Sequence, residues 1–172
     1  MKTVVVILLA AFASQVVGAP PPIPGNILGM LKEHLGSWET SGYTRDEKGT
    51  TPVKATWSCR GVSGGPGLLC TWHHEWMDRP PDVEEEIIGF DRESGKLRFT
   101  RVHPDGSVQS ILVDATGKSM DRRWEFQRDG QTAVGNNHID VVAPGHWEQR
   151  MTIEVGGKQT WEMVLTQRRV TQ

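Results

Sequence analysis

The feature that most constrains the fold is residues 53–76, VKATWSCRGVSGGPGLLCTWHHEW, which are nearly symmetric about a glycine-rich centre. The central SGGPG can form only a turn, because glycine readily adopts positive φ angles and proline lacks a backbone N–H donor. When the segment is folded at its centre, Cys59 lies opposite Cys70 and Trp57 lies opposite Trp72. The pattern predicts a two-stranded antiparallel ribbon with a wide turn.

The two faces of this ribbon differ in polarity. Side chains alternate between the faces of a strand, so the opposed cysteines and tryptophans share one face with His74. The other face is mostly polar and consists of Lys54, Thr56, Ser58, Arg60, Leu69, Thr71, His73 and Glu75. This polarity is typical of an antiparallel sheet that is buried on one side.

Residues 1–18 have the pattern of a secretory signal peptide. A positively charged start is followed by the apolar run VVVILLAAF at 4–12, which is shorter than the roughly 20 residues that span a bilayer, and then by small residues. We expect cleavage after Gly18, with cleavage after Ala13 and retention as an N-terminal anchor as the alternatives. The protein is therefore predicted to be secreted or periplasmic, with no membrane span.

Cys59 and Cys70 are the only cysteines of the chain. Directly opposed residues of an antiparallel pair bring their Cβ atoms to roughly 4.5–5.5 Å, close to the distance that a disulfide needs. An oxidising compartment favours the disulfide over two free thiols. We therefore predict a Cys59–Cys70 disulfide.

The rest of the chain has the length of one domain. Residues 19–25 are a proline-rich leader, and residues 26–172 are predicted to form the folded domain. Asn26 is a suitable N-cap for a short amphipathic helix over Ile27–Leu35, which Gly36 would end. A strand is expected to follow the helix directly.

Beyond the ribbon, turn dipeptides such as Ser-Gly, Asp-Gly and Pro-Gly recur at intervals that leave segments of strand length. These segments are 84–91, 96–103, 108–114, 120–128, 137–142, 146–155 and 159–169. The run Glu84-Glu85-Glu86 is interpreted as the solvated start of a strand. In the last hairpin we expect Ile153 to face Trp161, Met151 to face Met163, and Gln149 to face Leu165.

About ten sequential strands with one apolar face each would leave an open sheet with exposed edges and apolar surface. Closure into a barrel removes both, and a barrel of more than about eight strands tends to enclose a cavity. The predicted fold class is all-β, an up-and-down antiparallel β-barrel of about ten strands.

The order of a short helix, the motif Gly36-x-Trp38, a meander and a late arginine resembles the lipocalin and fatty-acid-binding superfamily, the calycins. More closely, residues 31–170, with LGSWE at 35–39 and IGFD at 88–91, resemble a group of small exported bacterial lipocalin-like proteins of unknown function. The resemblance implies that the helix closes one end of the barrel. It also implies that Trp38 plugs that end and that Arg169 packs across it.

An inward-facing set of aromatic, thioether and polar side chains forms the candidate ligand site. The set is Trp57, Trp72, His74, Arg101, Gln149, Met151, Trp161 and Met163. Indoles and thioethers suit a flat or apolar molecule, histidine and glutamine supply hydrogen bonds, and Arg101 would bind a carboxylate at the cavity mouth. The competing interpretation is that the tryptophans fill a solid barrel, that His74 bonds to neighbouring groups, and that Arg101 is exposed.

The predicted function is binding of a small apolar or aromatic molecule. One alternative is a metal-free isomerase or cyclase in which His74 moves a proton, and another is a ligand-free barrel that acts through surface protein contacts. His73 and His74 point to opposite faces and no catalytic motif is present, so we expect no metal site and no cofactor. With a net charge of −2 the chain has no excess of basic residues, so we expect no nucleic-acid partner. The sequence does not decide whether the protein forms a homo-oligomer.

Overall fold

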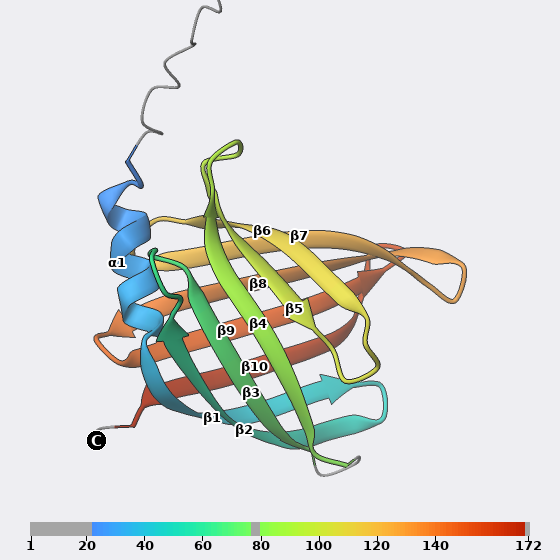
Figure 1. Ribbon diagram of the computed structural model, residues 1–172. Helices are drawn as coiled ribbons and strands as arrows, with labels where there is room; N and C mark the ends of the chain where they lie inside the picture. Colours follow the sequence, from blue (N-terminus) through green and yellow to red (C-terminus); the bar gives the residue numbers. More distant parts are fainter. Residues whose placement is uncertain (1–21, 77–79, 171–172) are drawn as a thin grey trace, which may run out of the picture.

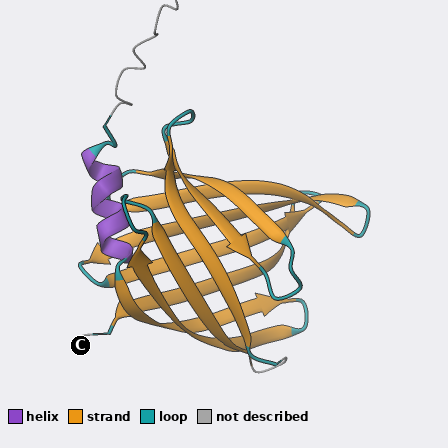
Figure 2. Cartoon of the chain, in the orientation of Figure 1, coloured by secondary structure: helices purple, strands orange, loops and turns teal. Residues whose placement is uncertain are grey.

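The computed structural model describes residues 22–76 and 80–170. Its elements are α1 (Gly25–His34), β1 (Gly36–Asp46), β2 (Gly49–Gly61), β3 (Leu68–Trp76), β4 (Asp82–Asp91), β5 (Lys96–Val102), β6 (Val108–Ala115), β7 (Ser119–Arg128), β8 (Gln131–Ala143), β9 (His146–Val155) and β10 (Lys158–Arg169). Each strand pairs antiparallel with its chain neighbour, and β1 pairs with β10, so the sheet closes (Figures 1 and 2). The predicted all-β, up-and-down barrel is confirmed.

The hairpin β2–β3 has the register that its symmetric sequence predicts. Trp57 pairs with Trp72 and Cys59 pairs with Cys70, and the two cysteines form a disulfide with a Cα–Cα distance of 4.1 Å. Gly64 has a φ of 85° in the connecting turn, a conformation that L residues rarely adopt. The predicted disulfide is confirmed.

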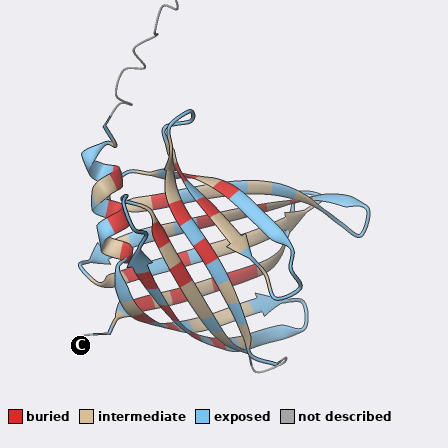
Figure 3. Ribbon diagram, in the orientation of Figure 1, coloured by how far each residue is buried: buried red, intermediate tan, exposed pale blue. Residues whose placement is uncertain are grey.

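The pairing of β9 with β10 also follows the sequence pattern. The three predicted pairs, Ile153 with Trp161, Met151 with Met163 and Gln149 with Leu165, are all present. Along β2, buried and exposed residues alternate, and similar alternation is visible across the barrel wall (Figure 3). One face of each strand therefore points into a common interior.

Helix α1 packs across one end of the barrel (Figure 1). Ile27, Met30 and Leu31 are buried and join the main core cluster of barrel side chains. The helix begins at Gly25, and Asn26 does not cap it, because its side-chain amide donates a hydrogen bond of 3.2 Å to the carbonyl oxygen of Ala115. That bond fixes the start of the helix to the end of β6.

Of all neighbouring strands in the barrel, β6 and β7 share the fewest residue pairs. Between these two strands, the described residues form only two pairs, Asp114 with Asp121 and Ala115 with Met120, both next to α1. Beyond these pairs the two strands diverge towards the end of the barrel opposite the helix (Figure 1). The inward side chains that follow, beginning with Arg122, therefore lie beside an unpaired seam.

Candidate ligand-binding cavity

The barrel encloses a cavity of about 240 Å³ that is bounded at one end by His34 of α1. Its apolar wall includes Trp57, Trp72, Phe99, Trp124 and Trp147. A larger depression of about 570 Å³ lies among the turns at the opposite rim, but charged residues of both signs line it. The interior cavity is the better candidate for a ligand site, because it combines apolar walls with convergent polar groups.

A row of stacked aromatic rings runs from the helix end of the cavity towards the mouth. The Trp38 and Trp57 rings stack at 4.8 Å, and Trp57 and Trp72 stack at 4.8 Å. The His74 ring continues the row at 6.0 Å from Trp72. Because their rings are nearly parallel, these residues pack face to face, and within the row Trp57 and Trp72 line the cavity.

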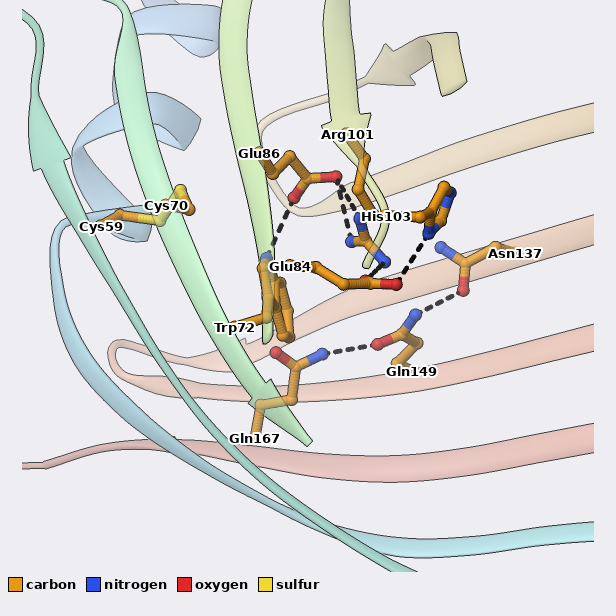
Figure 4. A network of polar contacts seen from close by, with 10 residues as sticks. All are labelled: Cys59, Cys70, Trp72, Glu84, Glu86, Arg101, His103, Asn137, Gln149 and Gln167. Atoms are coloured by element: carbon orange, nitrogen blue, oxygen red, sulfur yellow. Dashed lines mark hydrogen bonds and ion pairs between the residues drawn. A yellow bond between two sulfur atoms is a disulfide. The ribbon is translucent and has the colours of Figure 1, made fainter. Parts of the chain in front are cut away.

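Two glutamates of β4 and two basic residues at the end of β5 form an ionic cluster inside the barrel (Figure 4). The Arg101 guanidinium donates to Glu86 Oε1 at 3.2 and 3.0 Å and to Glu84 Oε2 at 3.0 Å. Glu86, only 2% exposed, also accepts a bond of 3.3 Å from the Trp72 indole N–H. The second Glu84 oxygen lies 2.8 Å from His103 Nδ1. The cluster thereby holds the Trp72 ring in place.

The carboxylates keep Arg101 charged. Burial by itself lowers the pKa of Arg101, but the attraction of Glu86 and Glu84 outweighs it, so the pKa is raised above that of a free guanidinium. All the hydrogen bonds found for its guanidinium go to these two glutamates. Arg101 is therefore an internal counter-ion within the cluster.

A chain of three buried amides forms the opposite wall (Figure 4). Gln167 Nε2 donates to Gln149 Oε1 at 2.7 Å, and Gln149 Nε2 donates to Asn137 Oδ1 at 2.7 Å. The Gln167 Oε1 atom at one end of the chain is buried and has no hydrogen-bond partner among the described residues. The amide chain is thus partly unsatisfied, and both glutamines line the cavity.

A second interior arginine, Arg122 of β7, lines the same cavity. Its Cζ atom lies 6.0 Å from the Phe99 ring centroid and 5.9 Å from that of Trp124. Its Nε atom is buried without a hydrogen-bond partner in the described part of the chain. Burial, together with repulsion from Arg101, lowers the pKa of Arg122 to about 10.

His34 forms the floor of the cavity below the aromatic rings. Its ring is buried, lies 4.6 Å from the Trp147 ring, and has its Nδ1 atom 2.7 Å from the Met30 carbonyl oxygen, to which it donates. Burial lowers the pKa of His34 below its usual 6.5. The imidazole is therefore neutral at pH 7.

Six of the eight side chains that the sequence nominates for ligand binding line the cavity. They are Trp57, Trp72, Arg101, Gln149, Met151 and Met163. Trp161 packs beside Met163 in a smaller apolar cluster and borders the outer depression. His74 lies beyond the cavity lining, with its Nδ1 atom 2.8 Å from Asp82 Oδ1.

One expectation about charged residues needs correction, and one charged residue of the cavity was not predicted. Glu86 is buried inside the barrel and is not part of a solvated strand start, because Arg101 and Trp72 satisfy its carboxylate. Arg122 was missed altogether. Arg122 stands two residues from both Met120 and Trp124, so strand alternation places it on the same inward face, and this pattern could have revealed it.

The fold and the cavity define a calycin-like barrel with a polar and aromatic interior. No family model matches the chain, and no curated protein matches it. A solved structure of similar fold is the S-type phycobiliprotein lyase CPES from Guillardia theta, with a TM-score of 0.53 and 12% sequence identity over 88% of this chain and 99% of that chain. Such low identity shows a shared fold alone. Membership of the exported bacterial group stays a prediction.

Proposed function

We propose that this protein binds a small, flat, largely aromatic molecule inside the barrel. The observation that carries the proposal is a set of buried polar atoms without partners among the described residues, all in residues that line the cavity: Arg122 Nε, Trp147 Nε1 and Gln167 Oε1. Buried polar groups are almost always hydrogen-bonded, so three unsatisfied atoms around one cavity favour a bound partner. The stacked indoles beside them supply the apolar surface for a ring.

Native mass spectrometry of the protein purified from its own host tests this proposal, because it detects a small molecule that survives purification. We expect a discrete additional mass that disappears on denaturation. The variant Trp72→Leu removes one wall of the cavity and should lose the bound mass. Trp161→Leu, whose side chain lies outside the lining, is the matched control and should keep it. Repeated absence of bound mass, with no calorimetric binding from an aromatic panel, would contradict the proposal.

A second candidate is catalysis on a molecule that extends from the cavity, past Trp72, to His74. The His74 and Asp82 pair favours it, because a carboxylate that orients an imidazole is a common arrangement for a general base. The similar structure is named a lyase, which supports an enzyme on this fold. His74→Gln should abolish turnover of the bound molecule and leave its affinity within a fewfold. Unchanged turnover would remove this candidate.

We also propose that the protein is exported. The Cys59–Cys70 disulfide supports an oxidising compartment. The signal peptide predicted at 1–18 lies outside the described residues, and no helix in the described ranges is long and apolar enough to cross a membrane. Intact mass of the protein from the periplasm or medium should correspond to a chain that begins at Ala19. An intact chain retained in the cytoplasm would contradict export.

A further inference from the structure

The interior of the barrel holds two arginines in contrasting environments. Arg101 has two carboxylate partners within hydrogen-bond distance. Arg122 has no ion pair with any residue in the described ranges 22–76 and 80–170, and its contacts there are with aromatic rings. The two nearby interior carboxylates, Glu84 and Glu86, bond to Arg101 and its neighbours instead.

The charge of Arg122 is therefore poorly compensated by the protein itself. The repulsion from Arg101 is a larger influence on Arg122 than the attraction of Glu86. With a pKa of about 10, the guanidinium nevertheless remains protonated at neutral pH. Arg122 is partly buried, with its Nε atom fully enclosed, and a cation in such a place without a paired anion is costly unless it serves a function.

We propose that Arg122 binds the acidic group of the ligand, so that the cavity takes a small aromatic carboxylate. This inference rests on the proposed binding function and deepens it. A guanidinium presents two parallel N–H donors that match a carboxylate, and the nearby Phe99 and Trp124 rings suit a flat ring attached to it. The cavity of about 240 Å³ is smaller than the roughly 300–1,000 Å³ of drug-sized sites, so the ligand is small.

Arg122 lies where the wall of the barrel has the fewest strand pairs. It follows directly after Asp121, the last residue of β7 that pairs with β6. The aromatic ring of an acid bound to Arg122 would share the cavity with the stacked indoles of Trp57 and Trp72.

Calorimetric titration with matched acid and amide pairs tests the ligand class directly. The probes are benzoic acid with benzamide, 2-naphthoic acid with 2-naphthamide, and indole-3-acetic acid with indole-3-acetamide, at pH 7 and low salt. Each pair has nearly the same shape and differs in charge. We expect the wild-type protein to bind at least one acid about tenfold or more tightly than its amide. Amides that bind as tightly as their acids would overturn the inference and leave the proposed binding function standing.

Variants of two adjacent arginines assign the preference to one side chain. Arg122→Gln should bring the acid affinity down to that of the amide while amide binding persists. Arg123→Gln is the matched control, because its side chain is 64% exposed on the outer face and should not affect either affinity. An acid preference that survives in Arg122→Gln would contradict the role of this residue.

Thermal unfolding separates a ligand-binding role for Arg122 from a structural one. If Arg122 is an uncompensated, partly buried cation, Arg122→Gln should raise the melting temperature of the ligand-free protein. A structural role predicts that the melting temperature falls instead, which would overturn the inference. Should Arg122→Gln fail to fold, Arg122→Lys keeps the charge without the two parallel donors and should weaken acid binding at least threefold. Binding of neither acids nor amides by the wild-type protein would contradict the proposed function as well.

Discussion

The guanidinium of Arg169 lies over the indole ring of Trp38, with its Cζ atom 5.0 Å from the ring centroid. The same guanidinium donates a hydrogen bond of 2.6 Å to the Glu33 carbonyl oxygen and lies 3.1 Å from the Glu33 carboxylate. The indole N–H of Trp38 in turn donates to the His34 carbonyl oxygen at 3.2 Å. One side chain near the C-terminus thus connects β10 to β1 and to the end of α1.

Replacement of Arg169 should loosen this end of the barrel. Arg169→Gln removes the ring contact and the two interactions with Glu33, and we expect it to lower the free energy of unfolding by about 1–3 kcal/mol. Arg168→Gln is the matched control, since Arg168 is exposed and should change stability by less than about 0.5 kcal/mol. Urea unfolding followed by tryptophan fluorescence measures both. Equal effects of the two substitutions would contradict the bridging role of Arg169.

The ionic cluster should show strong coupling between its members. Arg101→Met leaves Glu86 buried without its main counter-charge and should destabilise the protein by about 3–5 kcal/mol. The double variant Arg101→Met with Glu86→Gln should recover much of that loss, because it no longer buries an unpaired charge. A double-mutant cycle in urea provides the coupling energy. Additive effects of the two substitutions would show that the pair does not act as a unit.

Reduction of the Cys59–Cys70 disulfide should destabilise the fold without unfolding it. The disulfide closes a short loop within one hairpin, so its contribution is expected at or below about 2–3 kcal/mol. The double variant Cys59→Ser with Cys70→Ser should lose about as much stability as the reduced wild-type protein. Urea unfolding with and without a reductant checks this, and no shift on reduction would be inconsistent with a disulfide that constrains the hairpin.

His34 should make the protein sensitive to acid. Its pKa in the folded state lies below the ordinary 6.5, so the unfolded chain binds the proton more tightly, and stability falls as the pH drops through 6.5 towards the folded pKa. The stability advantage of wild type over His34→Gln should therefore shrink between pH 7.5 and pH 5.5. Urea unfolding across this range measures the difference.

The control for this pH dependence is His138. Hydrogen bonding to Asp121 raises the pKa of His138, with a further contribution from Asp140. Its stabilising contribution is present below pH 6.5 and is lost as the pH rises through the folded pKa, which is the opposite sense to His34. The advantage of wild type over His138→Gln should therefore increase as the pH falls. A flat pH dependence for His34→Gln would contradict a buried neutral imidazole.

The fold was largely predictable because its strongest signals are local. The symmetry of β2 and β3 sets their register, and alternation along β9 and β10 sets the inward face. The helix start was harder, because Asn26 bonds to Ala115, 89 residues away in the chain, and no local pattern shows that bond. Turn spacing and face alternation therefore predicted the closed barrel. They did not predict how α1 begins or how it is attached to the end of the barrel.

The candidate site was only partly predictable. The aromatic wall follows from strand alternation, but the run Glu84-Glu85-Glu86 was interpreted as a solvated strand start. Burial of a carboxylate is costly, and the partners that offset this cost, Arg101, His103 and Trp72, come from β5, the residue after it, and β3. Pairing of charges between distant strands cannot be derived from the spacing of residues along one strand. The inward position of Arg122, in contrast, could have been derived from that spacing.

The most direct test of the central claim is an amide NMR spectrum of the ¹⁵N-labelled protein, recorded with and without a saturating aromatic acid from the panel above. The claim is that the ligand binds inside the barrel, against the indoles of the cavity wall. The indole N–H signals of Trp57, Trp72, Trp124 and Trp147 should shift on binding, while that of Trp161 should stay nearly in place. Binding that leaves these four signals unmoved and shifts surface signals alone would contradict the account.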